Sequence, residues 1–170
     1  DEFQIVLETI SGGNSANYEW FKSAQNTGRI NNLRIGESIL LGRETLKREP
    51  IPGLHTDAFK LVAEVIEAKE KPTLPFGKVA QDAFGNVPIF VDQGIRKRAI
   101  LALGRQDVLV SGLKPVNSNL EILGASSDHL ILDSQHCDLK VGDEVKFSLD
   151  YSGLLSAMTS PFVKKHFKIS

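Results

Sequence analysis

The chain is poor in cysteine, in aromatic residues and in net charge. Cys137 is the single cysteine among 170 residues, which excludes an intrachain disulfide and a zinc site built on paired thiolates. Lysine and arginine (20) nearly balance aspartate and glutamate (21), so the formal charge is -1. No field over the whole chain therefore attracts nucleic acid or an anionic membrane. We expect a reducing compartment, by default the cytoplasm.

Long apolar runs are also lacking. Stretches such as 99–103 are far shorter than the roughly 20 residues that span a bilayer. The start of the chain lacks the basic and then apolar order of a signal peptide. We therefore expect neither export nor membrane insertion. The chain has no initiator methionine and begins almost at once with an apolar run, which we interpret as a segment of a longer protein.

The first part of the chain follows the order strand, helix, strand. The expected elements are a strand over 3–10 (FQIVLETI), a turn over 11–13, a helix over 16–24 and a second strand within 33–41. Asn14 and Ser15 are good N-caps for the helix. Such a unit belongs to a parallel sheet covered by helices, and it cannot cover its own sheet. We infer that it is the end of a larger α/β domain.

The composition changes near residues 43–55, which are charged and rich in proline. Beyond them the apolar pattern has a period close to two, which is typical of strands. Strands are predicted over 60–67, 89–91, 98–103, 129–132 and 145–149, a short helix over 153–158 and a last strand near 162–167. Several short strands separated by turns favour a β-barrel or sandwich. The chain should thus be mainly β with a short α/β start.

Residues 11–15 (SGGNS) lie between the first expected strand and helix. Glycines allow a close backbone approach and a helix start presents N–H donors, so this segment can hold an anion, above all a phosphate. A tight turn with a helix cap is the alternative interpretation. The glycine patterns of mononucleotide and dinucleotide loops are absent, which disfavours both of those site types.

Arg34 lies inside an otherwise apolar strand and precedes Gly36. An arginine in that environment is costly unless it is paired. It is either held in a structural ion pair or directed into a ligand cavity at the carboxyl end of its strand. Its nearness to the phosphate-type turn favours the cavity, because the carboxyl ends of neighbouring barrel strands lie at the same end.

Four separate segments of the sequence resemble segments of one protein family and follow each other in the same order. They are Asn14-Ser15 followed by 33–42 (LRIGESILLG), 82–85 (DAFG), 94–107 (GIRKRAILALGRQD) and 124–133 (GASSDHLILD). These segments are similar to the alanine/ornithine racemase branch of the pyridoxal-phosphate racemases with the alanine racemase fold. The resemblance covers nearly the whole chain and implies its C-terminal portion.

The resemblance implies a fold, a cofactor and partners. Residues 1–45 would be the last β-α-β segment of a truncated (β/α)8 barrel, and 46–170 a C-terminal β-barrel-like domain. The cofactor would be pyridoxal 5'-phosphate, the substrate an amino acid such as alanine or ornithine, and the assembly a head-to-tail homodimer. The implied reaction is interconversion of the L- and D-forms, with no nucleic acid, membrane or metal as partner.

The resemblance also assigns cofactor contacts. Asn14, Ser15 and the backbone N–H groups of Gly36 and Glu37 match the phosphate cradle of the family, and Arg34 matches the residue facing the pyridine nitrogen. A guanidinium is always charged, so it opposes protonation of the ring. An unprotonated ring withdraws fewer electrons, which favours return of the proton to Cα.

The two acid/base groups of a racemase are less well matched. The family's cofactor-binding lysine lies on an early barrel strand, which would precede residue 1. The family's tyrosine, contributed across the dimer, aligns near Asp82, which can do acid/base work if burial raises its pKa or can be a turn residue. Asp128 matches an aspartate at the active-site entrance of the partner subunit, with a plain hairpin aspartate as the alternative. His129, His136 and Cys137 lack the spacing of a zinc site.

Two functional hypotheses follow. The first is the C-terminal portion of an amino-acid racemase, inactive in isolation because the cofactor-binding lysine is missing. The second is a non-catalytic β-barrel binding or regulatory module, such as an oligonucleotide-binding barrel. That module would need a basic face rich in aromatic residues, whereas aromatics make up 7% of this chain.

Overall fold

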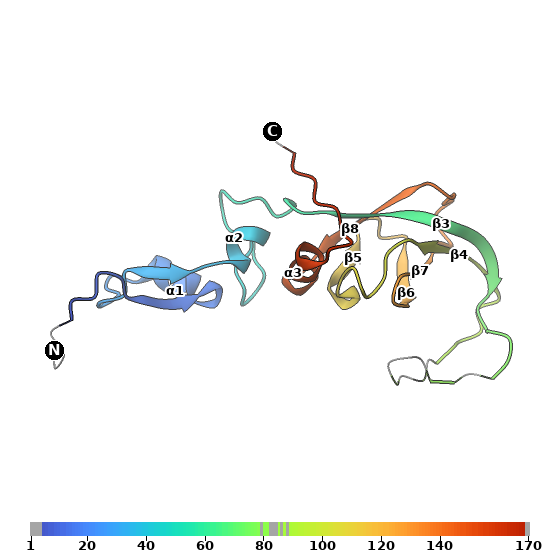
Figure 1. Cartoon of the computed structure of the whole chain (residues 1–170), viewed down its shortest axis with the longest axis horizontal. Coiled ribbons are helices and arrows are strands. Elements are labelled where there is room, and N and C mark those ends of the chain that lie inside the picture. The colour runs from blue at the N-terminus through green and yellow to red at the C-terminus, as the bar shows by residue number, and fades with distance from the viewer. Residues whose placement is uncertain (1–4, 79, 82–84, 86, 88, 169–170) are drawn as a thin grey trace. The chain divides into compact units, whose positions relative to one another are not determined.

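A computed structural model describes residues 5–78, 80–81, 85, 87 and 89–168. The chain divides into two compact units, Asp1–Phe59 and Lys60–Ser170, coloured from blue to green and from green to red in Figure 1. The predicted functional division into 1–45 and 46–170 rests on the family resemblance and stays a prediction.

The first unit is a small β-α-β arrangement. Its elements are β1 (Ser11–Asn14), the 3-10 helix η1 (Ser15–Asn17), α1 (Tyr18–Ser23), β2 (Asn32–Arg34) and α2 (Glu37–Leu41). β1 and β2 pair in parallel, which confirms the predicted order of strand, helix and strand. Asn14 caps the helical segment, because its Oδ1 accepts the N–H of Ala16 at 3.0 Å while its own N–H donates to Asn17 Oδ1 at 3.1 Å.

The boundaries in this unit differ from the predicted ones. The strand predicted over 3–10 is wrong within its described part, 5–10, where Ile5, Val6 and Leu7 are 67%, 88% and 58% exposed. The strand instead covers Ser11–Asn14, where a turn was expected, because that segment has β2 as its pairing partner. The apolar run 33–41 is likewise divided at Gly36 into β2 and α2.

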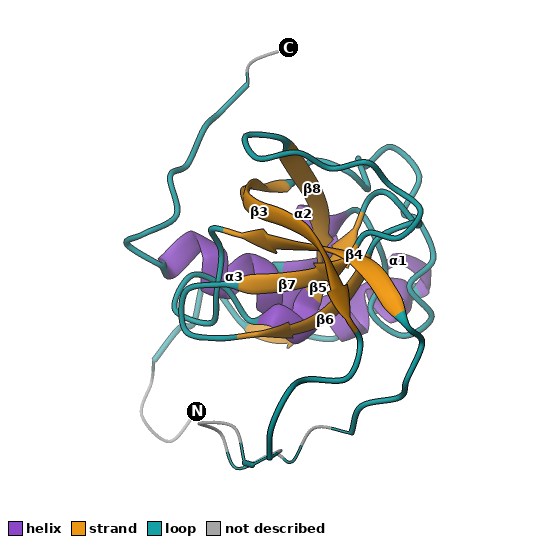
Figure 2. Ribbon diagram, turned by 90° about the vertical axis from the view of Figure 1, so that its right-hand side faces the viewer, coloured by secondary structure: helices purple, strands orange, loops and turns teal. Residues whose placement is uncertain are grey.

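The second unit is a six-stranded antiparallel sheet. Its strands are β3 (Leu61–Pro72), β4 (Ile95–Leu101), β5 (Leu113–Pro115), β6 (Glu121–Ala125), β7 (Leu130–Asp133) and β8 (Glu144–Leu149). Their order is β5-β8-β3-β4-β7-β6. The end strands β5 and β6 approach each other, so the sheet curls into a nearly closed barrel (Figure 2). This architecture confirms the mainly β fold class.

β3 is a central strand of the sheet and pairs with a different neighbour along each half of its length. Its start pairs with β8 and its end pairs with β4, with an irregularity between Val65 and Glu67. Before that irregularity the buried residues Leu61, Ala63 and Val65 alternate with exposed ones, as a half-buried strand requires. Two further elements follow in the chain, η2 (Val110–Gly112) and α3 (Tyr151–Thr159), and the second confirms the predicted helix.

The hydrophobic core lies inside this barrel. Its largest fully buried apolar side chains are Phe147, Leu101, Leu130, Leu132, Val65 and Val108. Full burial of one such side chain contributes roughly 1.5–3 kcal/mol relative to exposure. Leu154 and Ala157 of α3 are also buried, at 4% and 5% exposure. The second unit therefore has a core of its own.

Two predicted strands of this unit are wrong and two observed strands were not predicted. Residues 89–91 and 162–167 form no strand, and Ile89, Phe162 and Phe167 are 92%, 66% and 84% exposed. Their β-forming side chains have no neighbouring strand to pair with. β5 and β6 are short and contain proline or glycine, so they form only because β8 and β7 offer pairing partners.

Candidate functional site

The carboxyl ends of β1 and β2 bring the candidate cofactor-binding residues together. The two strands run in parallel, and Asn14 lies opposite Arg34 in their register. Ser15 follows the end of β1, and Gly36 and Glu37 follow the end of β2. The expectation that these residues lie at one end of two neighbouring strands is thus met by the backbone pairing. Their role in holding a cofactor stays a prediction.

A pair of buried serines joins these strand ends. Ser15 is 8% exposed and Ser38 is fully buried. The Ser38 N–H donates to Ser15 Oγ at 3.2 Å, and Ser38 Oγ donates to the Ser15 carbonyl at 3.4 Å. Accepting one bond leaves the Ser15 hydroxyl proton available for donation, because a hydroxyl is both a donor and an acceptor. Ser38 was not singled out from the sequence, where nothing distinguishes it from a surface serine.

Arg34 is the cationic group of the site. Its Nη1 donates to Ser11 Oγ at 2.7 Å, and Ser11 Oγ in turn donates to Asn32 Oδ1 at 2.9 Å. The Ser11 hydroxyl, the partner that the structure describes, is neutral, and Arg34 itself is exposed. A guanidinium has five N–H donors, so the contact with Ser11 orients the group and leaves donors for a ligand.

Glu37 begins α2, and its carboxylate is held from outside that helix. Its side chain is 20% exposed and forms an ion pair with Arg48. Gly36 is the N-cap residue of α2, and its carbonyl accepts the N–H of Leu40 at 3.0 Å. Arg48 is a second residue that sequence reasoning missed, since the contact spans a loop whose path the sequence pattern does not predict.

The donors present at this site fit a phosphorylated pyridine. The Ser15 hydroxyl and the backbone N–H groups of Gly36 and Glu37 are neutral donors of the kind that bind phosphate oxygens. Arg34 on the neighbouring strand adds a permanent cation that can donate to an unprotonated ring nitrogen. The chemistry of these residues is therefore compatible with pyridoxal 5'-phosphate.

Asp128 lies in a hydrogen-bonded turn of the second unit. Its Oδ1 accepts from the hydroxyls of Ser127 and Ser126, each at 3.1 Å, and lies 3.1 Å from His129 Nδ1. The two hydroxyls lower the pKa of Asp128 below its ordinary value, and that of Ser127 has the largest effect. The carboxyl is thus ionised at neutral pH. Asp82, the other candidate catalytic residue, lies outside the described residues.

The turn that carries Asp128 is docked against a second turn. The N–H groups of Arg105 and Gln106 donate to the carbonyls of Ser126 and Ser127 at 3.0 and 2.9 Å. At Gly104 an added Cβ would lie 2.3 Å from the Asp128 nitrogen, so only glycine fits this approach. Two of the sequence blocks that resemble the racemases therefore meet in space.

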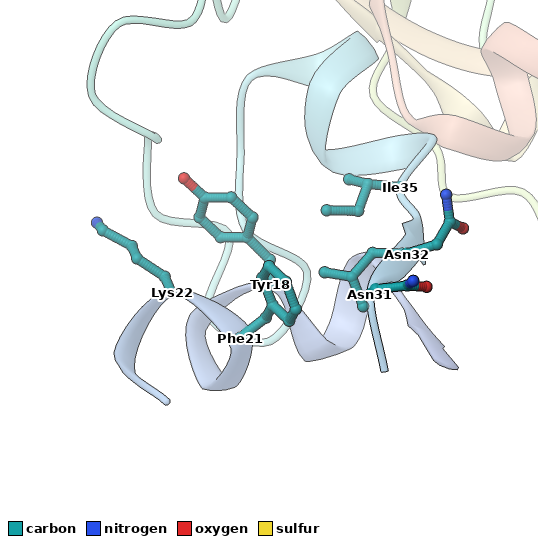
Figure 3. A pocket seen from close by; sticks show the side chains of 7 residues that line it. Tyr18, Phe21, Lys22, Asn31, Asn32 and Ile35 are labelled. Atoms are coloured by element: carbon teal, nitrogen blue, oxygen red, sulfur yellow. The ribbon is translucent and has the colours of Figure 1, made fainter. Parts of the chain in front are cut away.

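A hollow of about 400 Å³ lies between α1 and the segment around β2 (Figure 3). It is lined by Tyr18, Phe21, Lys22, Asn31, Asn32, Leu33 and Ile35. Tyr18 and Phe21 of α1 line this hollow, whereas Trp20 is 48% exposed. Leu33 and Ile35 line it from either side of Arg34, which is not itself one of the lining residues.

Two classes of site are absent from the part of the chain that the structure describes. No helix there is both long and apolar enough to cross a bilayer. No group of three or more histidine, cysteine, aspartate or glutamate side chains in the same residues is placed to hold a metal ion.

Comparisons with known proteins identify relatives of the chain. No protein-family model matches it. It is 49% identical to an ornithine racemase of Acetoanaerobium sticklandii over 166 residues, and 49% identical to a lysine racemase of Thermotoga maritima over 165 residues. Each match covers 96% of this chain and 47% of the relative. The chain thus spans about half the length of the curated relatives it matches.

Solved structures show the same fold. An alanine racemase from Oenococcus oeni matches 94% of this chain, and 46% of its own, with a TM-score of 0.57 and 16% identity. An alanine racemase from Bartonella henselae with covalently bound pyridoxal phosphate matches 94% of this chain and 43% of its own, with a TM-score of 0.56 and 18% identity. The sequence relatives and the shared fold agree: the chain is similar to about half of two amino-acid racemases and has the fold of the corresponding part of the alanine racemases.

Proposed function

We propose that the full-length protein containing this chain is a pyridoxal-phosphate-dependent amino-acid racemase, of which the chain is the C-terminal portion. The observation that carries the proposal is 49% identity, over 96% of the chain, to two amino-acid racemases. The substrates of these relatives, ornithine and lysine, are basic amino acids. We therefore propose alanine, ornithine or lysine as substrate, and a homodimer as the assembly.

The strand ends of the first unit are proposed to hold the cofactor. Asn14, Ser15 and the backbone N–H groups of Gly36 and Glu37 bind its phosphate, and Arg34 faces its ring nitrogen. When bound, pyridoxal phosphate withdraws electrons from Cα of the substrate and so eases removal of its proton. Arg34 would limit this withdrawal, because its permanent charge opposes protonation of the ring nitrogen. Racemisation would then require that a proton return to Cα on the face opposite the one from which it was removed.

Two carboxyls are proposed for the proton chemistry and for the substrate entrance. Asp82, which matches the position of the family's tyrosine in the sequence, is proposed as one acid/base group, and a lysine from an earlier part of the full-length protein as the other. Asp128 lies at the entrance of the partner subunit's site. Its lowered pKa keeps it an anion at neutral pH, so it can attract the ammonium groups of a substrate.

The packing of the first unit supports a larger barrel around it. Among its described residues, Ile51 is the one buried hydrophobic residue, at 4% exposure. Several large apolar side chains of the unit are exposed instead, namely Ile5, Val6, Leu7, Trp20, Ile39, Leu40 and Leu46. A β-α-β unit with so little buried surface needs further strands and helices to cover it. The curated relatives contain about as much chain again.

The test compares the full-length protein with the 170-residue chain. After incubation with pyridoxal phosphate, the full-length protein should show the absorbance of a lysine-linked cofactor and should racemise at least one of alanine, ornithine and lysine. The isolated chain should show neither. A full-length protein that binds the cofactor but leaves all three amino acids enantiopure would refute the proposed reaction. Turnover by the isolated chain would refute the need for a lysine outside it.

A further inference from the structure

The loop that follows α2 is tied closely to itself. Arg43 and Pro50 form an isolated antiparallel bridge, and the Ile51 N–H donates to the Gly42 carbonyl at 2.9 Å. The N–H of Glu44 donates to the Glu49 carbonyl at 3.0 Å. These bonds close residues 43–51 into a hairpin-like loop, called here the clamp loop.

A buried carboxylate fixes the clamp loop from inside. Glu44 is 7% exposed, and its oxygens accept the N–H groups of Leu46, Lys47 and Glu49 at 2.7, 2.6 and 3.0 Å. These hydrogen bonds lower the pKa of Glu44, and the bond from the Glu49 N–H has the largest effect. Burial acts in the opposite direction. The carboxylate is therefore ionised at neutral pH and holds the backbone around Arg48 in one conformation.

Arg48 has an unusual backbone conformation within this loop. Among the described residues it is the one non-glycine residue in the left-handed region, with φ of 64°. Such a conformation is strained for a residue with a Cβ and persists only where the surroundings hold it. The Arg43 guanidinium donates to the Arg48 carbonyl at 2.9 Å, and the Arg48 guanidinium pairs with Glu37. The clamp loop thus places a cation against the first residue of α2.

We infer that Arg48 is a positioning residue for the phosphate of the cofactor, acting by neutralising and holding the Glu37 carboxylate. This inference rests on the proposed function, in which the Glu37 backbone N–H binds that phosphate. A carboxylate on the residue whose N–H binds a phosphate dianion repels that dianion and so weakens its binding. The ion pair with Arg48 cancels most of that charge and keeps the carboxylate on the clamp loop.

The test measures dissociation constants of two probes, pyridoxal phosphate and pyridoxal, for the full-length protein and its variants. Arg48→Gly removes the cation while relieving the backbone strain, so the fold should persist. It should weaken pyridoxal phosphate binding by about tenfold and leave pyridoxal binding unchanged. Arg48→Gly combined with Glu37→Gln should recover the wild-type affinity, because the uncompensated carboxylate is gone.

Two further variants complete the comparison. Glu37→Gln alone should bind pyridoxal phosphate at least as tightly as the wild type, since it removes a negative charge and keeps Arg48. Arg29→Ala removes one positive charge elsewhere in the same unit and serves as the matched control, with both affinities unchanged. Circular dichroism at the temperature of the binding experiment checks that each variant is folded.

The outcomes distinguish a failure of the role of Arg48 from a failure of the proposed phosphate site. A wild-type protein that binds pyridoxal phosphate no better than pyridoxal contradicts the proposed phosphate site itself. A wild-type preference for the phosphate that is undiminished in Arg48→Gly overturns only the role of Arg48. A double variant as weak as Arg48→Gly, or a loss of phosphate affinity in Glu37→Gln, also overturns it, because the carboxylate would then not be the source of repulsion.

Discussion

At the scale of single residues, the ionisation of the candidate carboxyl depends on its neighbours. Asp128 is about half exposed, and burial alone would act to raise the pKa of its carboxyl. Two serine hydroxyls and the neighbouring His129 overcome that effect and stabilise the anion. The folded-state pKa lies below the ordinary value. Its contribution to stability is therefore present above about pH 4 and is lost as the pH falls through the folded pKa.

Removing the Ser127 hydroxyl tests this account. We expect Ser127→Ala to raise the pKa of Asp128, because the hydroxyl is the largest stabiliser of the ionised form. The measurement is a carboxyl ¹³C NMR titration of the folded chain. Glu67, whose pKa is lowered to about 2 by Lys69 and Lys71, is an internal control that should not move. An unchanged Asp128 titration would show that the serine does not set its charge.

At the scale of elements, two turns from distant parts of the sequence are packed backbone against backbone. The turn at 104–107 donates its N–H groups to the carbonyls of the turn at 126–129, and Gly104 makes this approach sterically allowed. A strand pattern predicts where β4 and β7 lie, and antiparallel pairing then places their ends together. The close contact between the turns is a consequence of that pairing and of a missing side chain.

Gly104→Ala should therefore destabilise the second unit. The new Cβ would lie 2.3 Å from backbone atoms of Ser127 and Asp128, which cannot rotate away as a side chain would. We expect a loss of roughly 1–3 kcal/mol in the free energy of unfolding, measured by urea denaturation. Gly124→Ala is the matched control, since no atom lies within 4 Å of its added Cβ, and it should cost less than about 0.5 kcal/mol. Equal stabilities of the two variants would contradict the close packing.

At the scale of the whole molecule, the two units differ in how much of their own surface they bury. The buried hydrophobic cluster around Phe147, Leu101 and Leu130 belongs to the second unit. The first unit has Ile51 as its buried hydrophobic residue within the described part of the chain. Hydrophobic burial is the dominant favourable term in folding, so the units should differ in autonomous stability.

Separate expression of the units tests this difference. Residues 60–170 should fold alone, with a dispersed amide NMR spectrum and a cooperative urea transition. Residues 1–59 should remain largely unfolded, because too little apolar surface is buried to offset the entropy of ordering the chain. The whole chain is the control. A cooperative transition in 1–59, or the absence of one in 60–170, would contradict the assignment of the autonomous hydrophobic core to the second unit.

Much of the fold was predictable from local patterns. Period-two runs predicted β3, β4, β7 and β8, and the sequence blocks that resemble the racemases predicted the similarity that the comparisons found. The runs 3–10, 89–91 and 162–167 have similar composition but form no strand in their described residues. A strand is stable only when another strand accepts its backbone hydrogen bonds, and composition does not report whether that partner exists.

The sequence by itself determined the β-α-β start, the mainly β remainder and the residue types of the candidate site, because periodicity and side-chain chemistry are local properties. Tertiary structure decided which of those residues meet. It buried Ser38 against Ser15, paired Arg48 with Glu37 and docked the turn at Gly104 onto the turn of Asp128. Each of these contacts joins residues separated by 11 or more positions, so its formation depends on how the chain returns to itself.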